Sequence, residues 1–166
     1  MSEHDAVNAD EEGDLIRAAA LYEECLPGGL TLGALLNLAV LYWQATDFGF
    51  LSAKNLPKEF VKRAGGRIAE VLQVASERFP GAEEVEFWKR YIAWADLGEP
   101  FSPDECQALT ERRPDYGEPM MYLLPATHTA EYRGKAQAAL SAYRGQRTVR
   151  ASYVTSVLES ALQQAG

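Results

Sequence analysis

Apolar side chains recur every three or four residues along most of this chain of 166 residues, a spacing typical of amphipathic α-helices. The longest such stripe consists of Phe60, Ala64, Ile68, Leu72, Ala75 and Phe79. No segment alternates apolar and polar residues for long enough to predict a strand. The pattern therefore predicts an all-α fold of six to eight helices, which follow one another as antiparallel hairpins.

Proline, glycine and capping residues set the expected ends of these helices. Ser102-Pro103-Asp104-Glu105 is a capping box, in which Ser102 caps the helix and Glu105 reaches back. Gly65-Gly66 predicts either a bend in its helix or a close crossing with another helix. We expect a loop over residues 47–56. The expected helices are 14–26, 31–46, 57–79, 82–97, 102–113, 129–143 and 148–164, with a short one inside 117–129.

Composition divides the chain into two parts. Residues 1–12 are polar, acidic and aperiodic, so we expect a disordered acidic leader. Residues 13–166 are predicted to form a single all-helical domain, since the chain is 47% apolar and long enough to bury a core.

Charge is distributed unevenly along the chain. The net charge is −8 at pH 7, which argues against nucleic acid as a partner. Residues 1–24 hold eight acids and one base, and residues 77–118 hold eleven acids and five bases. Residues 54–67, in contrast, hold five bases and one acid. The acidic middle is either a solvated surface or a patch that faces a partner with a basic surface.

Two further patterns bear on where the protein acts. No apolar run reaches the roughly 18 residues that a membrane span needs, so we expect no membrane partner. The acidic N-terminus lacks the features of a secretory signal, which predicts a cytoplasmic protein with reduced thiols.

Part of the chain resembles tetratricopeptide repeats. The strings Glu77-Arg78-Phe79-Pro80 and Glu111-Arg112-Arg113-Pro114 lie 34 residues apart, which is the length of one such unit. GDLIRAAALYEECL is similar to the second helix of a unit, and ALLNLAVLYWQATDF to the first helix of the next. This resemblance implies an irregular array of stacked helical hairpins.

Residues suited to catalysis are few and scattered. His4 and His128 are far apart in sequence, and the spacing of histidines and cysteines fits no metal motif. Cys25 and Cys106 fall on apolar helix faces, where core packing is expected. We therefore expect no enzyme activity, no catalytic residues, no metal and no cofactor. The rival interpretation is an enzyme or ligand receptor whose polar members are His128, Glu131 and Tyr132.

The resemblance implies a concave groove lined by the first helix of each unit. Trp43 and Trp88 are assigned to that groove, whereas Leu38 and Tyr42 are assigned to the core. If the groove assignment fails, Phe48, Phe50 and Leu51 are the next candidates. The full set of candidate partner-binding residues is Leu36, Val40, Trp43, Gln44, Glu83, Glu84, Glu86, Trp88, Ile92 and Asp96.

These features together favour a non-catalytic protein-binding module that forms a stoichiometric complex. Small, acidic, all-helical bacterial proteins of this kind include immunity proteins, which block a toxin, and that function is expected first. The alternatives are a tetratricopeptide chaperone or adaptor for a secreted effector, a small-ligand-binding helical enzyme, and a structural protein that self-associates.

Overall fold

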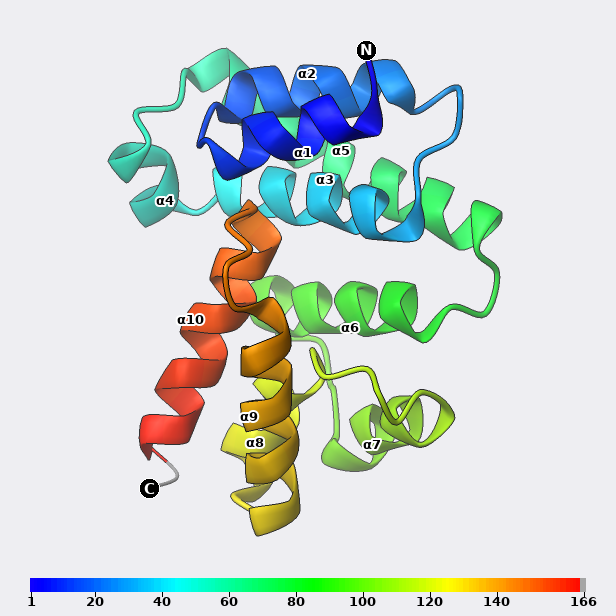
Figure 1. Ribbon diagram of the computed structural model, residues 1–166, viewed down its shortest axis with the longest axis vertical. Helices are drawn as coiled ribbons and strands as arrows, with labels where there is room; N and C mark the ends of the chain where they lie inside the picture. The colour runs from blue at the N-terminus through cyan, green and yellow to red at the C-terminus, as the bar shows by residue number, and fades with distance from the viewer. Residues whose placement is uncertain (165–166) are drawn as a thin grey trace. The chain divides into compact units, whose positions relative to one another are not determined.

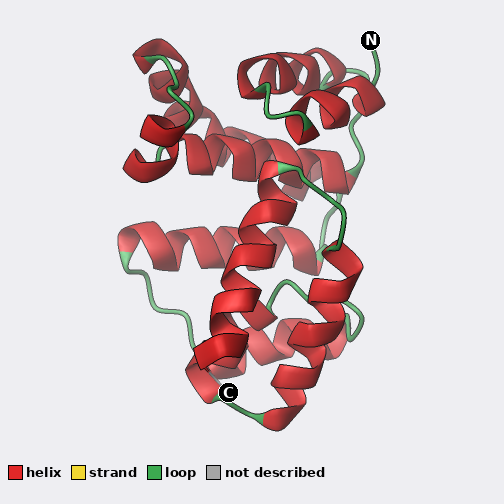
Figure 2. Cartoon of the chain, turned by 60° about the vertical axis from the view of Figure 1, so that its left-hand side comes forward, coloured by secondary structure: helices red, strands yellow, loops and turns green. Residues whose placement is uncertain are grey.

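The protein is seen here in a computed structural model that describes residues 1–164. These residues form ten helices and no strand, so the predicted all-α class is confirmed. Figure 2 shows the helices joined by loops. The number of helices exceeds the predicted six to eight because two short ones form where a leader and a loop were expected.

The contacts of the chain group it into two compact units. The first unit holds residues 1–80 with residues 146–150, and the second holds residues 81–145 with the chain from residue 151 onward. The single all-helical domain over 13–166 stays a prediction, and the segment 1–12 belongs to the first unit.

The first unit contains five complete helices: α1 (Glu3–Glu11), α2 (Leu15–Cys25), α3 (Leu32–Ala45), α4 (Phe48–Ala53) and α5 (Lys58–Arg78). Helix α1 lies alongside α2, and α3 lies alongside α5 (Figure 1). The resemblance to tetratricopeptide repeats made α2 the second helix of one unit and α3 the first helix of the next. The identity of the repeat stays a prediction.

The expected disordered leader is wrong, because residues 3–11 form α1. Its first turn is held by a capping box, in which the Asp5 backbone N–H donates to Ser2 and the Ser2 backbone N–H donates to Asp5. Ala6 and Ala9 are buried, since small side chains let α1 approach α2 closely.

Asp10 is the buried polar residue of α1, with 1% of its surface exposed. Its carboxylate accepts a hydrogen bond from the Tyr22 hydroxyl at 2.9 Å and another from the Val149 backbone N–H at 2.9 Å. Val149 begins α10 (Val149–Gln164), so a side chain near the start of the sequence caps a helix near its end.

Helices α3 and α5 pack against each other in the first unit. Every residue from Ala34 to Trp43 is buried, which confirms the core role of Leu38 and Tyr42. Helix α5 runs unbroken through Gly65-Gly66. A Cβ on Gly65 would lie 3.8 Å from Thr46 Cγ2, an ordinary contact, and a Cβ on Gly66 would meet no atom within 4 Å, so the space at these glycines does not require the absence of a side chain.

The second unit contains α6 (Glu83–Leu97), α7 (Pro103–Arg112), α8 (Met120–Thr127), α9 (Ala130–Tyr143) and α10 from residue 151 onward. Helix α8 packs against α7 on one side and α9 on the other. The capping box of Ser102 and Glu105 is present as predicted, and Gly98 ends α6 at φ +66°. No helix within residues 1–164 is both long and apolar enough to cross a membrane.

Candidate functional site

The groove residues predicted on α3 lie inside the protein. Leu36 is 1% exposed, Val40 is fully buried and Trp43 is 6% exposed, while Gln44 at the end of the row is half-buried. A helix that is apolar on every side is covered on every side, and α3 is such a helix. The assignment of these residues to a partner-binding groove is therefore corrected.

The groove residues predicted on α6 are likewise part of a core. Trp88 is fully buried, with its ring 5.6 Å from Phe87 and 5.8 Å from Tyr91 between centroids, and Ile92 is also buried. Asp96 alone of this set is exposed. The aromatic residues that suggested a binding surface are thus used to pack the second unit.

The predicted acidic patch at the start of α6 is paired in part with arginines. Glu83 pairs with Arg112 at 3.1 Å, and Glu86 lies 4.0 Å from Arg90. Glu84 is buried and pairs with Arg113. Arg90 and Arg113 also pair with Glu105 and Asp115, so the arginines compensate the acidic charge only in part. The docking role of the patch stays a prediction.

The residues of the rival ligand site differ in burial and contacts. His128 is exposed at the C-terminal cap of α8, and Glu131 pairs along its own helix with Lys135 at 3.3 Å. Tyr132 is buried, with the Lys135 ammonium 5.9 Å from its ring centroid. A shallow apolar hollow of the second unit is lined instead by Pro125, Tyr153, Ser156, Val157, Ser160, Ala161 and Gln164.

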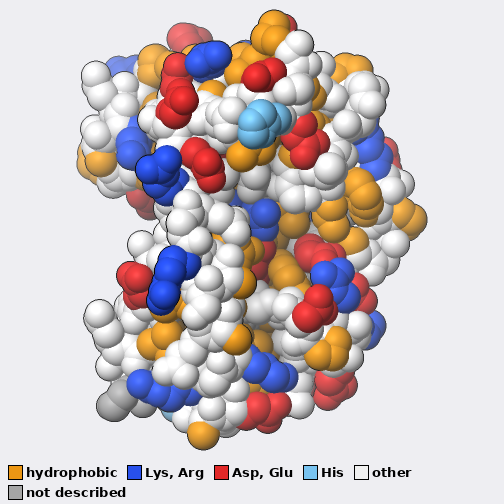
Figure 3. All heavy atoms as spheres, viewed as in Figure 1, with side chains coloured by type: hydrophobic (Ala, Val, Ile, Leu, Met, Phe, Trp, Pro, Cys, Tyr) orange, Lys and Arg blue, Asp and Glu red, His pale blue; other side chains and the backbone are white. Residues whose placement is uncertain are grey.

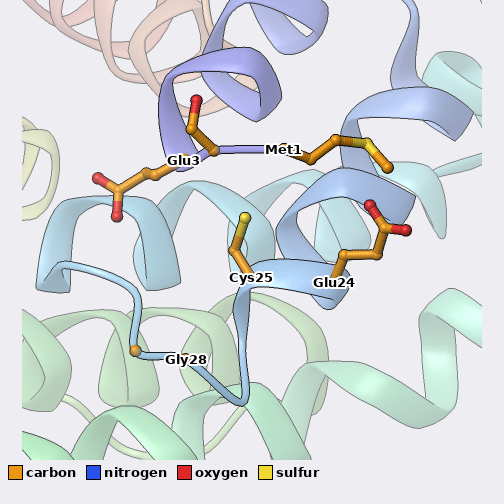
Figure 4. Close-up of a pocket in the computed structure, with 7 residues that line it drawn as sticks. Met1, Glu3, Glu24, Cys25 and Gly28 are labelled. Atoms are coloured by element: carbon orange, nitrogen blue, oxygen red, sulfur yellow. The ribbon is translucent and has the colours of Figure 1, made fainter.

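A pocket in the first unit contains Cys25, one of the two thiols. Figure 4 shows the Cys25 side chain pointing toward the segment that joins Met1 to Glu3, with Glu24 next to it on α2. The Glu3 carboxylate is engaged by Thr31, whose backbone N–H donates at 2.9 Å and whose hydroxyl donates at 2.6 Å. The pocket is also lined by Met1, Ser2, Gly28 and Gly29.

Cys106, the second thiol, lies in the core of the second unit. Burial raises the pKa of the Cys106 thiol to about 12, because the thiolate would lose its hydration. This residue therefore acts as a small apolar side chain, as the sequence predicted. Among residues 1–164 no group of three or more His, Cys, Asp or Glu side chains is placed to hold a metal ion.

The segment 47–56, which was expected to be a loop, contains α4 and carries the most exposed aromatic ring. Asp47 caps α4 by accepting a hydrogen bond from the Phe50 backbone N–H at 2.9 Å. Phe48 is 80% exposed, while Phe50 and Leu51 are half-buried. Two of these three side chains thus anchor α4, and Phe48 remains in solvent.

Basic residues follow Phe48 at the end of α4 and the start of α5. Lys54 ends α4 with its ammonium 6.0 Å from the Phe50 ring centroid, and α5 begins with Lys58 and Lys62 on one face, followed by Arg63. Figure 3 shows hydrophobic and basic side chains next to one another over α4. We call Phe48, Lys54, Lys58, Lys62 and Arg63 the α4 surface.

The cations of the α4 surface differ from the other basic residues of their segment. Arg67, one turn beyond Arg63, donates two hydrogen bonds of 2.8 Å to Glu23 and pairs with Glu70. Within residues 1–164, the four cations of the α4 surface have no carboxylate within 4.0 Å. The sequence analysis treated the aromatic residues of 47–56 and the basic residues of 54–67 separately, although the two groups are neighbours in the sequence.

Comparison with known proteins identified no similar protein. The chain matches no protein-family model, no curated protein and no solved structure.

Proposed function

We propose that this chain is a non-catalytic, cytoplasmic protein-binding module that acts by forming a stoichiometric complex. The observation that supports it is the exposure of Phe48, 80% of whose surface faces solvent on a capped helix. Burying a phenylalanine side chain contributes about 1.5–3 kcal/mol. A partner that covers Phe48 would therefore gain binding free energy of the size that a hot-spot residue contributes. In its finer form the proposal is a bacterial immunity protein that neutralises a toxin.

The test is purification of the tagged chain from its native host, followed by mass spectrometry of co-purifying proteins. The proposal expects one protein in equimolar amount. Phe48→Ser should lose this protein while keeping the melting temperature, since the ring is solvated already. Leu97→Ser is the matched control, because Leu97 is 73% exposed on the second unit and should retain the partner. Recovery of no stable partner by the unmodified chain would reject the proposal.

The partner's own activity separates the immunity function from a chaperone or adaptor function. An immunity protein is expected to abolish the toxicity of the recovered partner when both are purified and mixed at equal concentration. A chaperone for a secreted effector is expected to raise the solubility of the partner and leave its activity unchanged after release. Self-association, the third possibility, would appear as a larger mass of the chain alone in sedimentation experiments.

The sequence also favoured a partner with a basic surface, and such a partner would find exposed carboxylates on the first unit as well as in the acidic middle. Asp5, Glu12, Asp14 and Glu24 are exposed on or beside α1 and α2. Reversal of Glu12 and Glu24 to lysine would weaken binding of a basic partner at this region. If these changes leave the co-purified protein unaffected while Phe48→Ser releases it, the contact lies on α4.

A further inference from the structure

We infer that the end of α6 binds an arginine side chain of a protein partner, which stacks on Trp94 and pairs with Glu99. This inference goes beyond the proposed function, because it concerns a surface of the second unit and does not depend on Phe48.

The last turn of α6 and the turn that follows it are exposed. All seven residues from Trp94 to Pro100 are exposed, and two of them are large and apolar, Trp94 at 40% and Leu97 at 73%. Because residues three apart lie on the same side of a helix, these two side chains are neighbours. We call Trp94, Leu97 and Glu99 the α6 end.

Two hydrogen bonds place Glu99 next to the turn that carries Trp94. The Gly98 N–H donates to the Trp94 carbonyl at 3.1 Å, and the Glu99 N–H donates to the Ala93 carbonyl at 3.2 Å. Gly98 makes this possible because its left-handed backbone, at φ +66°, turns the chain back over the end of the helix. The exposed carboxylate of Glu99 therefore belongs to the same surface as Trp94.

The α6 end lies in an acidic part of the chain. Residues 91–111 hold five acids and no base. The base that precedes them, Arg90, lies 3.0 Å from Glu105 and 4.0 Å from Glu86. The hydrogen bond and charge of Glu105, followed by the charges of Glu86 and Glu99, raise the pKa of Arg90. One arginine is thus shared among three carboxylates, so negative charge remains for a cation of a partner.

The Trp94 ring is held in place by two tyrosines. Its centroid lies 5.6 Å from that of Tyr91 and 5.1 Å from that of Tyr122, which it meets edge to face. A ring that is fixed before binding and still exposed costs little conformational entropy when a partner covers it. Tryptophan is the ring on which cations bind best. Arginine fits this surface better than lysine, because its planar guanidinium can stack on a ring and pair with a carboxylate together.

The other strongly acidic part of the chain offers charge without a ring. Residues 1–24 hold one aromatic side chain, Tyr22, and it is fully buried. Two of the carboxylates there are also engaged, Glu3 by Thr31 and Glu23 by Arg67. A basic segment of a partner therefore gains ion pairing alone at residues 1–24, and ion pairing with stacking at the α6 end. The carboxylates of both regions would repel an anionic membrane.

The experiment is a titration of the full-length, ¹⁵N-labelled chain with an amidated synthetic peptide of Arg-Leu-Ser repeats, followed by NMR. The inference expects chemical-shift changes in the Trp94 indole N–H and in residues 94–100. Trp94→Ser should weaken binding by about fivefold or more, and Leu97→Ser and Glu99→Lys by about threefold each. The last two side chains are exposed, so these variants report on binding even if Trp94→Ser fails to fold.

Matched variants and ligands make the outcome specific. Glu59→Lys makes the same change of charge at an exposed position of the first unit, and Phe48→Ser removes the exposed ring of α4. Both should bind the peptide as the unmodified chain does. A peptide with lysine in place of arginine should bind more weakly. Vesicles of phosphatidylglycerol and phosphatidylcholine should not shift the same resonances.

The inference would be overturned by any of four results: no shift at millimolar peptide, shifts confined to residues 1–24, equal binding of the lysine peptide, or binding to the vesicles. Failure of the proposed function is a separate result, because it is read from the native host. The same two variants distinguish the surfaces: Leu97→Ser should weaken peptide binding and keep the partner held by Phe48, whereas Phe48→Ser should do the reverse.

Discussion

Substitution of Asp10 by asparagine tests the contact that joins the start of the first unit to the beginning of α10. The carboxylate is buried, and burial raises its pKa to about 6 from an ordinary value of 3.8. The charge of Glu11 acts in the same direction. The hydrogen bonds from the Val149 N–H and the Tyr22 hydroxyl, together with the positive charge of Arg150, oppose it.

The sign of the effect follows from linkage. Because the pKa of Asp10 is higher in the folded chain, the folded state binds a proton that the unfolded state releases, and the free energy of unfolding falls as pH rises between these two values. The rise in the pKa of Asp10 from 3.8 to about 6 corresponds to about 3 kcal/mol of the free energy of unfolding at low pH. This contribution is lost as the pH rises through about 6. Asparagine removes the charge, keeps an oxygen for the Val149 N–H and can donate to the Tyr22 oxygen.

The assay is urea unfolding of the unmodified chain and Asp10→Asn at pH 4 and pH 7. The free energy of unfolding of Asp10→Asn, relative to the unmodified chain, should increase by about 2 kcal/mol between pH 4 and pH 7, because the unfolded chain is already partly ionised at Asp10 at pH 4. Glu12→Gln removes a charge from an exposed site just beyond α1 and controls for net charge. A relative stability of Asp10→Asn that falls with pH would refute the reasoning, because the charged carboxylate would then be favoured by Arg150 and the helix terminus.

Four further changes test the packing. Deletion of residues 1–12 should lower the melting temperature by several degrees in calorimetry, since α1 is packed rather than disordered; an unchanged melting temperature would contradict this. Gly117→Ala should lower the free energy of unfolding by about 1–3 kcal/mol in denaturant titrations, because its Cβ would lie 2.4 Å from that of Ala139. Gly66→Ala should raise it by about 1 kcal/mol in the same titrations, as an exposed helical position with open space. Trp88→Ala should lower it by about 3–5 kcal/mol, and near-native stability of this variant would show that the ring is not a core element.

The helix ends could be predicted because their signals are local. Asp14, Thr31, Ser102 and Thr129 each accept a hydrogen bond from a backbone N–H three residues ahead, as their positions before apolar stripes indicated. Short helices escaped the same reasoning. Helix α1 has only small apolar side chains, and α4 has only six residues, so neither produces a stripe.

The candidate site could not be predicted because exposure depends on what covers each helix. The sequence of α3 does not show whether Trp43 faces solvent or another helix, and the residues that bury a side chain can lie far away in sequence. Likewise Glu83 and Arg112 are 29 residues apart, a separation that no helical spacing relates. The predicted groove failed at this step, whereas the local helix assignments did not depend on it.

Ion pairs change how much of a segment's charge reaches a partner. The glutamates that begin α6 have arginines within 4.0 Å, although Arg90 and Arg113 also pair with Glu105 and Asp115. The cations of residues 54–63, in contrast, have no carboxylate of the described chain within 4.0 Å. Contacts between segments far apart in sequence therefore decide how much charge a surface presents, and a count of acids and bases along the chain cannot show them.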